Sequence, residues 1–266
     1  SSAWTIKGGV AKGFQSPSIA QINPNIGLPQ RGGAQTWGNP DLKPEESINR
    51  EIGAYYDAGG AFRGNATIFD TDYTNKIVNT GSRQLVYPDG TPVPNDPYTG
   101  RVFSTYFNIT KAKIRGLELA GSYQFSPSLK LSGNYTLTDS KVKSAGVNIL
   151  GFGYPLADGQ PLVAVPTHAA SATLNWKAME NLSAFATVTY RGRESLISWG
   201  SGGAVSESVG SVATLDLGTA WSPRKDLTVN VVAYNLTNNV RPRNTSSAYS
   251  YAEDGRRLWV KMAYRF

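Results

Sequence analysis

The sequence has no cysteine and only one histidine, His168, in 266 residues. Without cysteine the chain has no disulfide framework, no thiolate metal site and no cysteine nucleophile. One histidine is too few for a multi-histidine metal centre. Charged residues make up only 17% of the chain, and the basic residues are scattered along it, with Arg256 and Arg257 as one tight cluster. The net charge of +7 therefore forms no phosphate-tracking stripe of the kind that binds a nucleic acid.

Long apolar runs and helical periodicity are also missing. No stretch approaches the roughly 18 consecutive apolar residues of a membrane helix. Residues 1–6 show neither the charged region nor the apolar region of a signal peptide. Because the chain starts within its repeating pattern, we expect it to be a piece of a longer polypeptide.

Alternation of apolar and polar residues dominates the chain and predicts β-strands. Turn residues bound ten such segments. The expected strands are 3–13, 46–57, 61–79, 104–125, 129–142, 167–177, 182–193, 211–222, 227–239 and 255–266. Their lengths exceed the five or six residues of an ordinary globular strand. Several reach the 9–11 residues that a tilted strand needs to cross a bilayer.

The connections between these segments alternate in length. Four are short, at 57–60, 126–128, 177–181 and 222–226. Five are long and rich in Gly, Pro, Asn and Ser, at about 14–45, 80–103, 143–166, 194–210 and 240–254. Loops this long are uncommon in compact soluble domains, whereas outer-membrane barrels have short periplasmic turns and long extracellular loops. The fold class expected is all-β, a transmembrane antiparallel β-barrel.

The two faces of the expected strands differ in polarity. In 182–191 the even-numbered residues from Leu182 to Tyr190 are mainly apolar, and the odd-numbered ones from Ser183 to Arg191 are mainly polar. One face suits lipid and the other a wet lumen, although a soluble antiparallel sheet alternates as well. Aromatic residues beside the short turns predict a girdle at the periplasmic membrane interface. They are Tyr55, Tyr56, Phe62, Tyr123, Phe125, Trp176, Trp221, Tyr264 and Phe266.

Candidate catalytic residues are few. His168 could serve as a general base, but its nearest acids in sequence, Asp158 and Glu180, show no catalytic spacing, so we expect a structural or solvated histidine. Asp70 and Asp72 share a strand face but supply too few oxygens for calcium or magnesium. We expect them to be a lumen-facing or loop-proximal polar pair. The sequence predicts no catalytic residue, no metal ligand and no phosphate-binding glycine-lysine motif.

The long loops carry arginine and planar aromatic residues among Gly, Ser, Asn and Pro. Guanidinium groups and aromatic rings together suit an anionic ligand that itself carries aromatic groups. The candidate substrate-binding residues are Arg31, Trp37, Arg83, Tyr98, Arg101, Tyr154, Trp199, Tyr249 and Tyr251; Tyr87, Arg241 and Arg243 lie in the same loops. The alternative is that these side chains merely keep the long loops folded on one another.

Five segments, in the same order along the chain, resemble motifs of TonB-dependent outer-membrane receptors. Residues 10–18 read VAKGFQSPS, and residues 38–53 read GNPDLKPEESINREIG, which is the most specific match. Residues 108–119 read NITKAKIRGLEL, residues 234–239 read YNLTNN, and residues 255–266 read GRRLWVKMAYRF. The style of these motifs is most similar to the ferric siderophore receptors, and among them to the catecholate branch.

The resemblance implies a 22-stranded barrel around an N-terminal plug, of which residues 1–266 would be the C-terminal portion, about ten strands, without the plug. It implies a receptor of the bacterial outer membrane that binds a ferric siderophore at extracellular loops and imports it without covalent chemistry. No cofactor is expected, with iron present only in the carried chelate. The expected partners are the TonB-ExbB-ExbD complex through the plug, outer-membrane lipid and lipopolysaccharide, and not nucleic acid. The Arg and Lys residues are expected on lumen faces and loops, where they would attract anionic iron complexes or lipopolysaccharide phosphates.

Other functions fit the same sequence. Ten is a permissible strand number for a self-contained barrel, such as an outer-membrane protease that uses His168 near the extracellular rim. A general porin is a second alternative. Import of glycans, haem or cobalamin on the receptor scaffold is a third, and a glycan would need aromatic stacking without the arginines. The receptor hypothesis further predicts that the natural polypeptide extends upstream through a plug.

Overall fold

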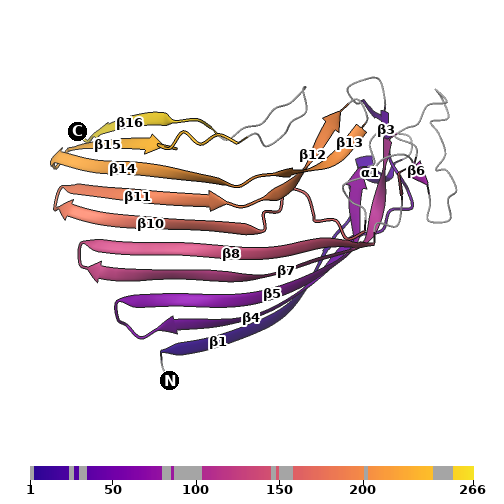
Figure 1. The fold of residues 1–266 in the computed structure, drawn as a ribbon, viewed down its shortest axis with the longest axis horizontal. Helices are drawn as coiled ribbons and strands as arrows, with labels where there is room; N and C mark the ends of the chain where they lie inside the picture. Colours follow the sequence, from indigo (N-terminus) through magenta and orange to yellow (C-terminus); the bar gives the residue numbers. More distant parts are fainter. Residues whose placement is uncertain are drawn as a thin grey trace.

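The computed structural model describes residues 3–23, 27–29, 35–79, 85–86, 104–144, 148–149, 158–200, 203–241 and 254–266. Ten long strands form one antiparallel sheet in which each strand pairs with its neighbours in chain order (Figure 1). They are β1 (Trp4–Gln15), β4 (Glu45–Asp57), β5 (Phe62–Asn79), β7 (Ser104–Ser126), β8 (Leu129–Ser144), β10 (His168–Met179), β11 (Leu182–Arg191), β14 (Val212–Arg224), β15 (Leu227–Tyr234) and β16 (Arg257–Tyr264). All ten expected strands are thus confirmed.

One expected strand is too long in the prediction. The segment 227–239 was expected to be a single strand, but β15 ends at Tyr234. Asn235 and Asn238 have φ angles of +45° and +52°, and two left-handed residues within four positions turn the backbone out of the sheet. The chain therefore turns at Asn235.

Shorter elements gather at the end of the sheet opposite the short turns (Figure 1). They are α1 (Ile19–Ile22), β2 (Gly27–Pro29), β3 (Gln35–Trp37), β6 (Leu85–Val86), β9 (Asn148–Ile149), β12 (Glu194–Gly200) and β13 (Gly203–Val209). The loop expected at 194–210 is in fact the hairpin β12–β13, paired from Glu194 with Val209 to Gly200 with Gly203. That prediction was wrong because the backbone groups of this segment pair with one another rather than with water. In the part of the chain described, no helix is both long and apolar enough to span a membrane.

The strand register gives the sheet one apolar and one polar face. Ile52 pairs with Ile68, Ile68 with Leu117 and Leu117 with Leu137, so the apolar residues of four strands align. On the other face, polar side chains of β1 to β10 line a groove of about 720 Å³. In a barrel wall the polar face lines the lumen, so we assign the polar face to the concave side. The apolar face is then the convex side that meets lipid.

Aromatic residues on the convex face mark the end with the short turns. The ring centroids of Trp4 and Tyr56 are 4.8 Å apart, and those of Tyr56 and Phe62 are 5.9 Å apart. Trp176 and Trp221 continue the row and are about half exposed. The girdle prediction was wrong for Tyr55, which lies on the concave face, where the Lys7 ammonium sits 4.9 Å from its ring centroid. Amphipathic rings at this level identify the membrane interface on the side of the short turns.

Arginine substitution at neighbouring positions of β11 tests the assignment of the two faces. Val188 lies on the convex face, four residues beyond Ala184, which pairs with Trp176. That offset puts it about 10 Å inside the girdle, near mid-membrane. We expect Val188→Arg to destabilise the barrel by about 2–4 kcal/mol and Thr189→Arg, on the concave face, by less than about 0.5 kcal/mol. Urea unfolding of the full-length protein in bilayers measures both, and equal effects would contradict the assignment.

Candidate ligand-binding end of the barrel

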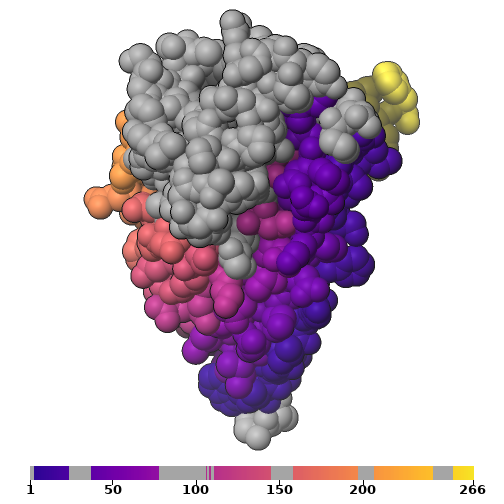
Figure 2. Space-filling model, turned by 90° about the vertical axis from the view of Figure 1, so that its right-hand side faces the viewer, coloured from indigo at the N-terminus to yellow at the C-terminus, as the bar shows by residue number. Residues whose placement is uncertain are grey.

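Two of the nine predicted ligand-binding residues lie in short elements, β3 and β12, at the end of the sheet away from the girdle, which is the end that faces the viewer in Figure 2. Of the nine, Trp37 lies in β3 and is half-buried, and Trp199 lies in β12 opposite Ala204. These two belong to different hairpins. The other seven, and Tyr87 and Arg243 with them, fall outside the described residues: Arg31, Arg83, Tyr98, Arg101, Tyr154, Tyr249 and Tyr251. Their contact with a ligand remains a prediction.

Residues 38–47 are the first part of the most specific motif of the sequence. They attach the end of the first long connection (about 14–45) to the sheet. The Asn108 side chain donates to the carbonyls of Lys43 at 2.9 Å and Asn75 at 2.5 Å, and its oxygen accepts from the Lys43 N–H at 2.8 Å. The Asn39 side chain donates to the Tyr106 carbonyl at 2.9 Å. These bonds fasten the motif to β5 and β7. Its residue pattern is thus explained by positioning of the loop.

A short segment before β10 fills part of the lumen. Leu162 is buried in a cluster with Ala112 and Val142, whose side chains point to the concave face. The Val142 N–H donates to the Gln160 carbonyl, and the Gly159 N–H donates to the Val142 carbonyl, both at 2.9 Å. Residues 158–165 therefore pack against the inner wall at the extracellular end.

A buried carboxylate joins the segments around this mouth. Glu194, at the start of β12, has a side chain with no exposed surface. It accepts from Arg191 at 2.5 Å and 3.0 Å, and from Arg241 at 2.8 Å. Arg241 also donates to the carbonyls of Gly210 at 2.5 Å and Gly192 at 3.3 Å. Charge-assisted bonds of this kind are stronger than neutral ones, and together they clamp the base of β12–β13 to the segment after β15.

The hydrogen bonds of the Arg241 side chain are consequently made within the protein. Its side chain is only 6% exposed and bonds to Glu194 and to two carbonyls. The sequence left open that such arginines keep the long loops folded on one another rather than bind a ligand. Arg241 has this structural role. We call Arg191, Glu194 and Arg241 the mouth clamp.

The motif at 234–239 fixes the last long loop in a similar way. The Asn235 side chain donates to the carbonyls of Asn239 at 3.1 Å and Asp254 at 2.8 Å. Its oxygen accepts from the Thr237 hydroxyl at 3.1 Å and the Asn239 N–H at 3.0 Å. One buried asparagine thereby ties together the two ends of the connection between β15 and β16.

His168 contacts a side chain of the neighbouring strand β8. Its Nδ1 atom lies 2.8 Å from the hydroxyl of Tyr135. In the register His168 stands opposite Leu137, on the convex face. Within the described ranges, no group of three or more His, Asp or Glu side chains is placed to hold a metal ion.

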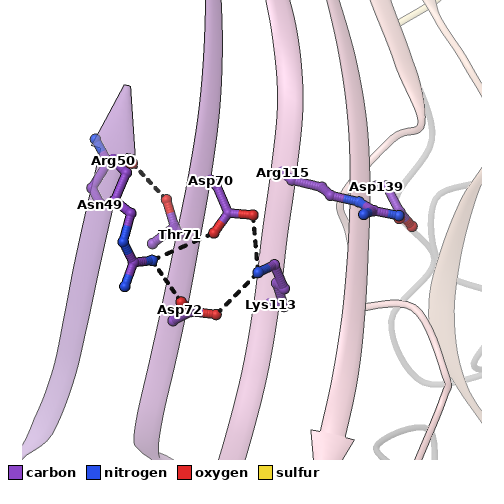
Figure 3. A network of polar contacts seen from close by, with 8 residues as sticks. All are labelled: Asn49, Arg50, Asp70, Thr71, Asp72, Lys113, Arg115 and Asp139. Atoms are coloured by element: carbon purple, nitrogen blue, oxygen red, sulfur yellow. Dashed lines mark hydrogen bonds and ion pairs between the residues drawn. The ribbon is translucent and has the colours of Figure 1, made fainter. Parts of the chain in front are cut away.

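Asp70 and Asp72 belong to an ion-pair network on the convex face (Figure 3). Arg50 contacts Asp72 at 2.7 Å and Asp70 at 3.5 Å, while Lys113 contacts Asp70 at 2.9 Å and Asp72 at 3.4 Å. The register aligns these residues with Ile52 and Ile68 rather than with the lumen. The pair was expected to be lumen-facing or loop-proximal. The lumen-facing position was wrong, because Asp70 and Asp72 stand two and four positions beyond Ile68 and so share its face.

Comparison with known proteins agrees with this architecture. A family model described as "TonB dependent receptor-like, beta-barrel" matches residues 1–236. An iron-regulated outer membrane virulence protein of Vibrio cholerae is 32% identical over 99% of this chain and 37% of its own length. The ferrienterobactin receptor of Escherichia coli is 31% identical over 72% of this chain and 24% of its own length.

The solved structures show the same fold. A mutant ferric enterobactin receptor of Pseudomonas aeruginosa, in complex with enterobactin, superposes with a TM-score of 0.74 at 25% identity. The match covers 99% of this chain and 39% of that one. The matches cover between about a quarter and two fifths of the length of these relatives.

Proposed function

The chain belongs to the TonB-dependent receptor β-barrel family of the outer membrane, and from this we propose that the whole protein binds a ferric siderophore at its extracellular end and imports it into the periplasm. The observation that carries the proposal is the 32% identity, over 99% of the chain, to an iron-regulated outer membrane protein. The identity to a ferrienterobactin receptor favours a catecholate chelate as the cargo.

The geometry supports this function in two ways. The wall is apolar outside and polar inside, so a charged chelate could pass along a wet lumen. The described connections at the extracellular end are anchored at their bases by Asn108, Asn235 and the mouth clamp. Anchored bases let loop side chains present a surface of defined shape. The nine loop residues predicted from the sequence remain our candidates for that surface.

The other parts of the proposal concern the whole receptor. Residues 1–266 form the C-terminal portion of the barrel, and a plug encoded upstream connects it to TonB-ExbB-ExbD. Iron crosses only within its chelate, and the barrel holds no cofactor of its own. The reaction is binding and translocation without covalent chemistry. The bond between His168 and the Tyr135 hydroxyl, on the lipid-facing side, supports this choice over a protease.

Uptake by cells tests the proposal. The full-length protein is expressed in a strain that lacks its own siderophore receptors, with and without TonB, and uptake of radioactive iron is followed. We expect TonB-dependent uptake of a ferric tris-catecholate. Uptake of haem, cobalamin or a glycan in its place would overturn the assignment of the cargo. Casein hydrolysis that is lost in His168→Ala would overturn the receptor function itself.

A further inference from the structure

Residues 158–165, which precede β10, run along the concave face and are called here the inner strap. β8 continues to Ser144, beyond the last of its residues that pair with β10. The strap takes the place of β10 beside this free part of β8. The Val142 N–H donates to the Gln160 carbonyl and the Gly159 N–H donates to the Val142 carbonyl, as in a strand ladder.

One leucine anchors the inner strap to the wall. Leu162 is 8% exposed and packs against Ala112 and Val142, which are 2% and 0% exposed. Tyr73 and Ile114 lie at the edge of this cluster. We call the hollow that receives Leu162 the leucine pit. Every other side chain of the strap is exposed or half-buried, so the apolar attachment depends on one residue.

The backbone of the inner strap turns sharply on both sides of its anchor. Gly159 has a φ angle of +82° and Ala164 one of +60°. Glycine adopts this left-handed conformation freely, but alanine is strained in it because its Cβ atom crowds a neighbouring carbonyl. Strained backbone persists only where surrounding contacts hold it. The strap is therefore expected to change conformation when the contacts of Ala164 are broken.

The contacts of Ala164 come from the base of hairpin β12–β13. Its N–H donates to the Ser195 carbonyl at 2.8 Å, and its carbonyl accepts from the Arg191 guanidinium at 3.3 Å. Arg191 is part of the mouth clamp and contacts Glu194 as well. The strap thus connects the hairpin at the mouth to a pit in the inner wall.

We propose that the inner strap is a conformational latch that couples β12–β13 to the inner wall. In the closed state the mouth clamp holds Ala164 in its strained conformation and Leu162 stays in the leucine pit. A chelate that binds the hairpin better in a displaced position withdraws Ser195 and Arg191 from Ala164, and the strap leaves the wall. Trp199, a candidate ligand-binding residue, lies in β12. Release of the latch precedes passage of the chelate.

Thiol labelling of the leucine pit tests the coupling. Val142→Cys is made in a full-length receptor without other cysteines, and its reaction with a small maleimide is timed. We expect a saturating ferric tris-catecholate to speed this labelling about tenfold or more, because labelling follows the population of the open state. The matched control is Val232→Cys, since Val232 is also a buried valine, 7% exposed, but lies on β15. An equal response of the two cysteines would overturn the proposal.

Variants test the latch without any ligand, so this arm does not rest on the proposed function. In the Val142→Cys receptor, Glu194→Ala frees the hairpin and Leu162→Ala empties the pit, and each should speed labelling about tenfold. Ala164→Gly relieves the strain and should slow labelling. Glu180→Ala, in an exposed turn, should change nothing. Labelling that Glu194→Ala leaves unchanged would overturn the coupling, whatever the receptor imports.

Folding of each variant is checked by the mobility of the unheated protein on gels. Glu194→Gln replaces Glu194→Ala if that variant does not reach the membrane, because it keeps the volume of the side chain and removes the charge that both arginines contact. It is then expected to speed labelling in the same direction, and an unchanged rate would again overturn the coupling.

A disulfide between strap and wall tests the role of the latch in import, which does rest on the proposed function. Leu162→Cys/Ala112→Cys links the strap to β7, and Ala112→Cys/Val142→Cys links two wall residues that stand opposite each other. We expect oxidation to stop chelate uptake only in the first pair, to leave chelate binding intact, and to be reversed by a reductant. Undiminished uptake in the oxidised first pair would overturn this role. Absence of chelate binding in the unmutated receptor would instead contradict the proposed function.

Discussion

Glu194→Ala in the full-length receptor is expected to release the hairpin β12–β13 from the mouth of the barrel. The mutation leaves Arg191 and Arg241 without the buried carboxylate that both contact. Removing one partner of a buried ion pair costs about 3–5 kcal/mol, because the remaining charge loses its compensation. Since each 1.4 kcal/mol is tenfold, amide hydrogen exchange in the hairpin should speed up by about a hundredfold or more.

The exchange measurement has a close control within the chain. Glu180→Ala removes an exposed glutamate from the short turn after β10 and should leave exchange in β12–β13 unchanged. Glu194→Gln keeps an acceptor oxygen and should give an intermediate rate. If Glu194→Ala and Glu180→Ala exchange alike, the mouth clamp does not hold the hairpin.

Gly116→Val is expected to reduce sharply the yield of folded barrel. A Cβ atom at Gly116 would lie 2.1 Å from the backbone carbonyl oxygen of Leu137 and 2.7 Å from the ring of Phe69. The ring can rotate, but the carbonyl belongs to the ladder between β7 and β8. Overpacking typically costs about 1–3 kcal/mol, and contact with fixed backbone falls at the upper end.

Gly60→Val is the control for this substitution. Gly60 lies in the short turn between β4 and β5, and a Cβ atom there would meet nothing within 4 Å. The fraction of protein that migrates as the folded form, without heating, measures both variants. Similar folded fractions would show that the barrel wall tolerates a side chain at Gly116.

The strands were predictable because a barrel wall repeats one simple rule. Each strand has lipid on one side and water on the other, so alternation alone bounded β5 and β11 to within one or two residues. The end of β15 was not predictable from alternation. Apolar residues occur on both faces near its end, with Val232 and Leu236 among them, and the left-handed asparagines Asn235 and Asn238 turn the chain out of the sheet.

The face that carries the ion-pair network of Asp70 and Asp72 could have been read from the sequence. Ile68, Asp70 and Asp72 stand two positions apart, with one residue between each pair, so they share a face in any strand. The expectation that charges face the lumen concealed this pattern. That expectation ignores the part of a strand that extends to the membrane surface, where charge on the lipid side costs little.

The mouth clamp depends on contacts that alternation does not encode. Glu194 and Arg241 are 47 residues apart in sequence, and their pairing follows from the hairpin and the turn at Asn235. A weak signal was present, because Glu194 is the only acid between 181 and 206 and stands beside Arg191 and Arg193. Most of the predicted ligand-binding residues lie outside the described part of the chain, so their role stays a prediction.

Equilibrium binding of a ferric tris-catecholate to the purified full-length receptor tests the proposed function most directly. Quenching of tryptophan fluorescence is measured as the chelate is added, with ferric hydroxamate, haem and cobalamin as competitors. The account predicts saturable, submicromolar binding of the tris-catecholate that none of the competitors displaces. Absence of saturable catecholate binding, together with saturable binding of haem or cobalamin, would contradict it.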